Sequence, residues 1–463
     1  MDETQRLARF AAEYAAERIP ADVVHLSARC LLDDIGVSLG AWDEPAVQIA
    51  REVAEELGGA SQATLIGGGR TSLVQAATIN GIASHVLDFD DSHDPTILHG
   101  TGPVMSAALV AAELVDASGP QLLAAHAIGF EVAARVALAV HPEHYDQGFH
   151  VTGTAGTLGA TAAAGRLLGL SAEQMANALS AAAAQAAGLR EMFGSMTKSL
   201  HAGKAAGNGV YSALLARRGW VSTREGLEGR RGYWAVLSSR MDPDRAMKGL
   251  GEAWELRHDG LKPYSCGVVS HPTIDAMRHL RQTAQVPADQ ISEVQARVNP
   301  YVLELMGKLA PQVGLEGKFS IYHCAAIAYL DGAARVRQFS DEAVLRPDVV
   351  ALRQKVRAEI DAALPTSAAR VRLVVADGRS WEESVDAASG TPENPMTDQE
   401  LMEKTLDLVD GRLERRVVTS LAERILGGTV PSAREVMAVV TGVPASGVPG
   451  VPMSGLPMSG LPM

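Results

Sequence analysis

One short stretch of the sequence concentrates residues that can move protons. Residues 84–102 contain four aspartates and three histidines, together with a proline and two glycines, and they include Asp88, Ser92 and His99. An imidazole titrates near neutral pH and a carboxylate can orient it, so these residues form an acid-base cluster. A loop that caps the neighbouring helices is the alternative interpretation, because Asp, Ser and His are also common in turns.

Metal binding is a third use that these residue types permit, since His and Asp bind divalent cations. The sequence contains neither an HExxH motif nor a paired CxxC motif, so we predict no metal site. The cysteines, Cys30, Cys266 and Cys324, are too few and too scattered for a disulfide framework or a zinc site. This cysteine usage indicates a reducing compartment.

A second candidate segment is 148–156, where small residues surround His150 at the start of a long Ala/Gly-rich helix. Backbone amides and threonine hydroxyls at a helix N-terminus can bind an anion. Close packing of helices, which small residues also permit, is the alternative interpretation.

A third candidate segment, 196–208, has Lys198 and His201 on one side of a predicted helix. A lysine in an alanine-lined helix is costly to bury unless it meets an anion, so this spacing favours a cation and an imidazole facing one cleft. A lysine at a fraying helix start is the alternative.

Two segments nearer the C-terminus add further polar residues. The extended Lys262-Pro263-Tyr264 segment runs into a helix that starts near His271. Cys266 lies close to that histidine, but no orienting residue or oxyanion signature accompanies it, so we predict no cysteine nucleophile. Residues 317–326 are a polar entry into an alanine-rich helix and contain Tyr322 and His323.

The spacing of apolar residues predicts a mainly α protein with a large all-helical domain and a smaller α+β lid domain. Helical patterns dominate the first 240 residues, whereas 291–302 and 370–375 alternate apolar and polar residues and Asp377-Gly378 predicts a hairpin turn. We place the helical domain at 1–265, completed by 400–440, and the lid at 266–399. The Pro/Gly/Met-rich tail, 442–463, is predicted to be disordered.

Composition excludes several classes of protein. The chain has 463 residues with 47% hydrophobic content, enough for a large core in two or three domains. Its net charge of −13 argues against a nucleic-acid partner, because phosphate binding requires a basic face. Apolar runs are interrupted before they reach membrane-spanning length, and the N-terminus lacks a signal pattern. We therefore expect a cytoplasmic protein without a membrane partner.

Taken together in order, these motifs resemble the MmgE/PrpD superfamily, which includes 2-methylcitrate dehydratase, cis-aconitate decarboxylase and iminodisuccinate epimerase. The resemblance extends from the first helix to about residue 440. The motifs that carry it are Asn80-Gly81 with His85; Leu87 to His93; His99; Gly148-Phe149-His150 with Thr154-Ala155-Gly156; Thr197-Lys198 with His201 and Gly203; Lys262 to Cys266 with His271; Lys318-Phe319-Ser320; and Asn394 to Asp398.

The resemblance implies an active site between a helical domain and a lid, in a homodimer that uses no cofactor. By the resemblance, the catalytic residues are Asp88, His99, His150 and Lys198, and the substrate-binding residues are Ser92, Lys262, Tyr322 and His323. The implied substrates are small polycarboxylates, and the shared event is a bond made or broken at the carbon next to a carboxylate. Such chemistry requires a base within reach and cations beside the carboxylate that gains charge.

The sequence departs from the common family pattern at His99-Gly100-Thr101 and at Tyr322-His323. We predict a hydro-lyase that removes water from a hydroxy-polycarboxylate such as a 2-methylcitrate-like acid. An epimerase or a decarboxylase on the same scaffold is the alternative, because all three reactions need proton transfer beside a carboxylate. A non-catalytic dimeric scaffold with a partner-binding tail is a further alternative, which the clustering of His, Asp and Lys disfavours.

Overall fold

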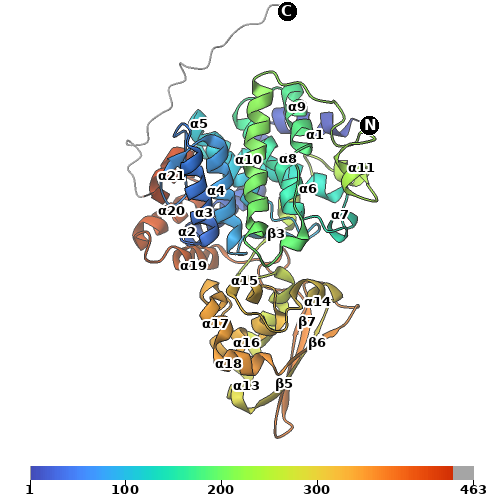
Figure 1. Cartoon of the computed structure of the whole chain (residues 1–463), viewed down its shortest axis with the longest axis vertical. Helices are drawn as coiled ribbons and strands as arrows, with labels where there is room; N and C mark the ends of the chain where they lie inside the picture. The colour runs from blue at the N-terminus through green and yellow to red at the C-terminus, as the bar shows by residue number, and fades with distance from the viewer. Residues whose placement is uncertain (1, 442–463) are drawn as a thin grey trace, which may run out of the picture.

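The alanine-rich segments of the chain form helices that pack around one large apolar core, and a second, smaller core lies below it (Figure 1). The computed structural model describes residues 2–441. We call the part around the first core, with buried side chains from Leu7 to Leu261 and from Met396 to Val440, the body. The part around the second core, from Tyr264 to Val385, is the lid. The predicted mainly α fold with a smaller α+β domain is confirmed.

The body contains fifteen of the α-helices in the described residues and two short strand pairs. Its helices are α1 (Glu3–Glu13), α2 (Ala21–Gly40), α3 (Pro45–Leu57), α4 (Leu73–Val86), α5 (Thr101–Val115), α6 (Gly119–Leu138), α7 (Glu143–Asp146), α8 (Val151–Leu167), α9 (Ala172–Ala183), α10 (Thr197–Arg217), α11 (Tyr233–Leu237), α12 (Pro243–Met247), α19 (Asp398–Leu408), α20 (Arg415–Leu426) and α21 (Ala433–Thr441). Its strands are β1 (Ala63–Thr64) with β2 (Arg70–Thr71), and β3 (Asp91–His93) with β4 (Asp259–Leu261), both pairs antiparallel.

The lid packs short helices against a four-stranded sheet of order β6-β5-β7-β8. Its strands are β5 (Ile291–Val298), β6 (Val356–Ile360), β7 (Ala369–Val375) and β8 (Ser380–Val385). Its helices are α13 (His271–Ala284), α14 (Pro300–Met306), α15 (Gly314–Gly317), α16 (Ile321–Asp331), α17 (Asp341–Leu345) and α18 (Pro347–Arg353). Strand β5 pairs in parallel with β6 and antiparallel with β7, and β8 extends the sheet as predicted from the Asp377-Gly378 turn.

The described residues of the two domains also form six 3-10 helices. These are η1 (Ala16–Arg18), η2 (Arg190–Met192), η3 (Glu255–His258), η4 (Val268–Ser270), η5 (Ala288–Gln290) and η6 (Val336–Phe339).

Glycines let helix α8 lie very close to its neighbours. A Cβ placed on Gly153 would lie 2.4 Å from the carbonyl oxygen of Ala187, and one on Gly156 would lie 2.8 Å from Pro103. Such separations are too short for any side chain larger than hydrogen. The small residues of 148–156 therefore serve close packing, which favours that interpretation over an anion site.

Helix α6 is, among the described residues, the one helix long and apolar enough to cross a membrane. Its most apolar stretch is 94% buried inside the body, and its Glu131 and Arg135 side chains pair with each other at 2.7 Å. Burial on all sides explains an apolar helix without a bilayer, so we interpret α6 as a core helix. The predicted disorder of 442–463 concerns residues outside the described part.

Candidate active site

A cavity of about 40 Å³ lies at the junction of body and lid and collects five of the predicted site residues. The body lines it with Asp88, Ile97, His99, Tyr145, His150, Phe193, Lys198 and Lys262, and the lid lines it with Gly267, Val268, Val269, Leu305, Met306 and Phe319. These residues come from segments distant in the sequence. The cavity holds only a few water molecules, so a substrate must enter while the lid is displaced.

Asp88 is the point where two buried lysines meet. Its Oδ1 atom accepts hydrogen bonds from Lys198 Nζ at 2.9 Å and from Lys262 Nζ at 2.7 Å, while Oδ2 is buried without a hydrogen-bond partner. Burial opposes ionisation of Asp88, but the two ammonium groups outweigh it and hold its pKa well below the usual range. Asp88 is thus a fixed anion that keeps both ammonium groups at the cavity wall.

The backbone around Asp88 is held by the lid. Asp88 ends the turn after α4 in the left-handed region, with φ of 51°, which aspartate and asparagine tolerate better than most residues. The carbonyl oxygen of the preceding Leu87 accepts hydrogen bonds from Ser265 Oγ and from Lys318 Nζ, each at 2.6 Å. The unusual conformation is therefore fixed by contacts from the lid.

His99 is oriented as a proton acceptor. Its Nδ1 lies 2.6 Å from the carbonyl oxygen of Asp91, which can only accept, so Nδ1 carries the proton and Nε2 has a free lone pair. Burial, with the Lys262 ammonium next in importance, places the pKa of His99 well below its ordinary value. His99 is therefore neutral at pH 7 and can act as a general base.

His150 belongs to a histidine pair. As the residue before α8, it presents Nδ1 at 2.9 Å from Nδ1 of His201 on α10. Two nitrogens at this distance must share one proton, so either ring can be the donor. Burial is the main cause that lowers the pKa of His150 well below its usual range, and it lowers that of His201 to about 4. When His201 is the donor, the one proton of the neutral His150 ring lies on Nε2, so His150 can donate it toward the cavity while its Nδ1 takes the shared proton.

His85 and Asp90 form a second layer behind these rings. His85 Nδ1 lies 2.6 Å from Asp90 Oδ2, and the ring of His85 lies 5.0 Å from that of His99 and 5.5 Å from that of His150. Ligand atoms of His85, Asp90 and His99 come within 4.8 Å of one another, as a metal site would require. However, Lys262 Nζ lies 3.7 Å from Asp90 Oδ1 and already supplies a positive charge. We interpret the group as a hydrogen-bonded network, and the predicted absence of a metal stays a prediction.

Three predicted substrate contacts lie outside this cavity. Ser92 lines a neighbouring cavity of about 50 Å³, which shares Ile97 and Lys262 with the first. Tyr322 and His323 line neither, because Ser320 caps α16 and the following turn directs His323 into the lid core. There His323 Nε2 lies 2.9 Å from the carbonyl oxygen of Gln338. From this segment Phe319, rather than Tyr322 or His323, lines the cavity.

Residue patterns alone did not reveal every group around the cavity. The acidic stretch contains His85 and Asp90, but its pattern assigns neither of them a role. The helix spacing predicts that His201 faces the same cleft as Lys198, and the structure places His201 against His150. Nothing in the local sequence marked Ile97 or Phe193. These residues reach the cavity only through tertiary packing.

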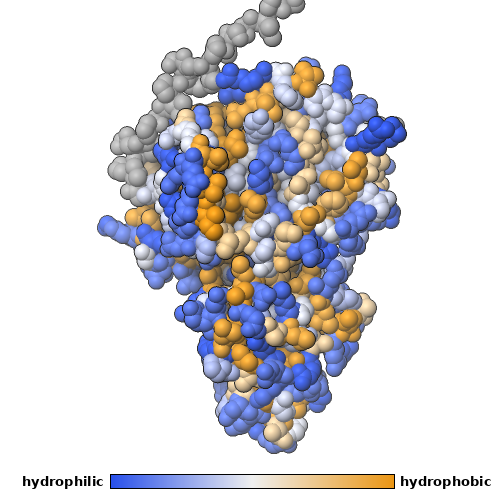
Figure 2. Space-filling model, in the orientation of Figure 1, coloured by the Kyte–Doolittle hydropathy of each residue, from blue (hydrophilic) through white to orange (hydrophobic). Residues whose placement is uncertain are grey.

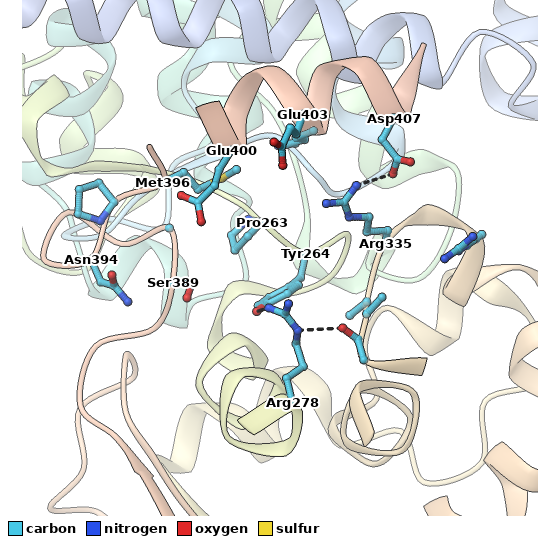
Figure 3. Close-up of a pocket in the computed structure, with 17 residues that line it drawn as sticks. Pro263, Tyr264, Arg278, Arg335, Ser389, Asn394, Met396, Glu400, Glu403 and Asp407 are labelled. Carbon is cyan, nitrogen blue, oxygen red and sulfur yellow. Dashed lines mark hydrogen bonds and ion pairs between the residues drawn. The ribbon is translucent and has the colours of Figure 1, made fainter. Parts of the chain in front are cut away.

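A wider groove of about 490 Å³ opens on the other side of the Lys262-Pro263-Tyr264 segment (Figure 3). Two of its arginines have partners within the groove, since Arg335 Nη1 pairs with Asp407 at 2.7 Å and Arg278 Nη1 donates to the Tyr264 hydroxyl at 2.6 Å. Its lining within residues 2–441 includes no histidine. The smaller cavity, which brings together a base, a proton donor and two ammonium groups, is the better candidate for chemistry.

The neutral state of the histidines predicts the acid limb of the pH profile. Protonation of His99 would remove the lone pair that accepts the substrate proton, so kcat/KM should fall as pH decreases. Because the pKa of His99 is well below the ordinary value of about 6.5, this fall should begin only below that pH. Steady-state rates measured across the pH range, with circular dichroism as a check on folding, would test this. An acid limb centred at or above pH 6.5 would contradict it.

Comparison with known proteins identifies the family of this chain. The MmgE/PrpD N-terminal domain model matches residues 5–246, and the MmgE/PrpD C-terminal domain model matches residues 264–426. The chain is 28% identical to a cis-aconitate decarboxylase of Aspergillus terreus over 460 residues, covering 92% of each protein. It is 28% identical to the human cis-aconitate decarboxylase over 400 residues (82% of each), and 26% identical to the mouse enzyme over 418 residues (86% of this chain and 85% of the enzyme). With both domain models matched in order across most of its length, the chain belongs to the MmgE/PrpD family.

Proposed function

We propose that this protein is a cofactor-independent hydro-lyase that removes water from a small hydroxy acid carrying more than one carboxylate. The observation that supports this best is the pairing of an oriented neutral base with a separate proton donor. His99 Nε2 can accept a proton and the His150–His201 pair can supply one. Dehydration needs both groups, because a proton leaves carbon while hydroxide departs as water.

The proposed reaction proceeds in one active site without a covalent intermediate. The substrate carboxylate binds beside Lys198 and Lys262, and His99 Nε2 takes the proton from the adjacent carbon. The electron pair moves toward the carboxylate, where the two ammonium groups stabilise the added negative charge. The carbon–carbon double bond then forms as the β-hydroxyl leaves, and the proton on His150 Nε2 completes the water molecule. His150 takes the shared proton from His201 at Nδ1, and the half-buried His201 regains a proton from solvent. Asp88 keeps both lysines in place throughout.

Decarboxylation is the second candidate, favoured by the activity named for the relatives at 26–28% identity. In that case a carbon–carboxylate bond breaks and releases carbon dioxide, the same ammonium groups stabilise the electron pair, and the His150–His201 pair supplies the proton that the carbon takes up. Epimerisation, the remaining alternative, would use His99 and His150 on opposite faces of one carbon.

Proton NMR in D2O separates these reactions when the purified protein is incubated with 2-methylcitrate, citrate, cis-aconitate, iminodisuccinate, malate and tartrate. A hydro-lyase is expected to give new vinyl signals, or for 2-methylcitrate a methyl signal shifted by an adjacent double bond, from a hydroxy acid with all carboxyl groups kept. Product one carboxyl group shorter would identify a decarboxylase, and deuterium exchange without new vinyl signals an epimerase. Unchanged spectra with every acid would contradict the proposal and favour the non-catalytic scaffold.

We also propose that the protein is a homodimer that associates through an apolar groove on the body. The groove, of about 500 Å³, lies between α3, α4 and α10, and Figure 2 shows apolar surface on this face. Ile49, Val53 and Leu57 of α3 are 51%, 47% and 73% exposed within the described part of the chain. Contiguous exposed apolar surface of this kind is typical of protein interfaces.

Sedimentation velocity would test this assembly. The wild-type protein is expected to sediment as a dimer, and Val53→Asp should shift it to a monomer by placing a charge in the interface. Val221→Asp, at an equally apolar position outside the groove that is 80% exposed, is the control and should leave the dimer intact. A wild-type monomer at all concentrations would refute the proposal.

A further inference from the structure

The body and the lid contribute different kinds of side chain to the lining of the active-site cavity. Every ionisable side chain in it comes from the body, whereas the lid contributes Val268, Val269, Leu305, Met306 and Phe319 besides Gly267. The lid wall therefore offers aliphatic and aromatic surface and, within the described residues, no charged side chain. Part of any substrate held there must lie against apolar atoms.

The charge available to hold anions is small. The lining contains two ammonium groups, those of Lys198 and Lys262, and one carboxylate, that of Asp88, which pairs with both. His99 and His150 add no positive charge at pH 7, because burial lowers their pKa values. Behind this wall Asp90 and Lys318 contribute one charge of each sign. Together, the three lysines and two aspartates named here carry a net formal charge of about +1.

The neighbouring cavity offers a place for a second anion. Lys262 lines both cavities, and so do Ile97, Val268 and Val269. The second cavity is also lined by Ser92, Thr366 and Thr391, and by Asp94, whose side chain belongs to an exposed residue. One carboxylate can therefore lie beside Lys198 and another between Lys262 and Ser92. The region between them is aliphatic.

A third carboxylate would have no partner. It would face the apolar lid wall or stand beside the other two in a site with little positive charge, and burying an unpaired carboxylate is strongly unfavourable. An alkyl group in the same position would gain from leaving water, by about fourfold in affinity for each methylene buried.

We propose that the substrate is a dicarboxylate with an alkyl branch rather than a tricarboxylate, an inference that rests on the proposed function. The alkyl branch packs against Ile97, Val268 and Val269. The two carboxylates are held at the two ends of the joined cavities. The branch occupies the space between them when the lid is closed.

Binding and turnover of a matched panel test this inference. Calorimetry and NMR rates would be measured with malate, 2-methylmalate and 2-(propan-2-yl)malate as dicarboxylates, and with citrate, 2-methylcitrate and cis-aconitate as tricarboxylates. We expect affinity and kcat/KM to rise from malate to the branched dicarboxylates, with the best of these at least about tenfold above every tricarboxylate. Equal or better use of a tricarboxylate would overturn the inference and leave the proposed function standing. No binding and no reaction with any acid would overturn both.

A charge introduced at the lid wall gives a second test. Leu305 is half-buried and packs against both cores, so a longer polar side chain can be accommodated at its outer edge. Leu305→Lys should raise citrate affinity relative to 2-methylmalate by at least about tenfold, because it supplies the missing cation. Leu305→Gln, which adds polarity without charge, is the control and should not shift the ratio toward citrate. An unchanged ratio in a folded Leu305→Lys protein would count against the inference.

Discussion

Replacing Asp88 with asparagine is expected to destabilise the protein by about 3–5 kcal/mol and to remove most of its activity. Asparagine has nearly the same shape and tolerates the left-handed backbone at this position. It cannot, however, supply the negative charge that both Lys198 and Lys262 contact. Two buried ammonium groups would then repel each other without a shared counter-ion. Urea unfolding followed by circular dichroism would measure the loss of stability, and NMR rates the loss of activity.

Asp407→Asn is the matched control for this prediction. Asp407 pairs with Arg335 across the groove between body and lid, but its side chain is 56% exposed, so the same substitution should cost at most about 1 kcal/mol. Adding Lys262→Met to Asp88→Asn separates the two effects, because it removes one unpaired charge. The double variant should regain stability without regaining activity. Equal stability of wild type and Asp88→Asn would show that Asp88 is not the shared counter-ion.

Replacing His99 with glutamine is expected to lower kcat/KM by about 10²–10⁴-fold while the fold is retained. Glutamine can still donate a hydrogen bond to the Asp91 carbonyl, but it cannot accept a proton from carbon. His323→Gln is the informative comparison, because His323 was implied by the family resemblance yet lies in the lid core. It should keep kcat/KM and KM close to wild type. Similar losses in both variants would contradict the assignment of the base.

Local patterns were sufficient to predict most of the helical body. The spacing of Leu7, Phe10 and Ala11 predicts α1, and these side chains are buried as expected. The Ser171 and Thr397 capping boxes predict the starts of α9 and α19, and both reciprocal pairs of hydrogen bonds are present. Such features depend on neighbours within one helical turn, so they can be read without knowledge of the fold.

The short strands were not predictable in the same way. Strand β6 buries only its first residue, Val356, and so lacks the alternation that identified β5 and β7. Strand β3 consists of Asp91, Ser92 and His93, and it exists because β4 pairs with it from more than 160 residues away. Pairing over such a distance leaves no local signal.

The same distinction applies to the site. Lys198 and His201 share a helix face, so their common direction follows from their spacing. The structure places Lys198 at the cavity wall and His201 in the histidine pair beside the cavity. The meeting of Lys198 with Lys262 at Asp88 depends on the packing of α10, β4 and the turn after α4, which only the fold determines. The position of His323 depends equally on how α16 packs in the lid.

Deuterium incorporation tests the central claim most directly, namely that this cavity transfers a proton at the carbon next to a carboxylate. The acid with the highest turnover would be incubated in D2O until the reaction reaches equilibrium, so that the reverse reaction returns a solvent-derived proton to the carbon, and recovered substrate and product would be analysed by mass spectrometry and NMR. The wild-type protein should place deuterium at that carbon, whereas His99→Gln and Asp88→Asn should do so at a small fraction of the rate. Wild-type turnover without carbon-bound deuterium, or undiminished exchange in both folded variants, would contradict the account.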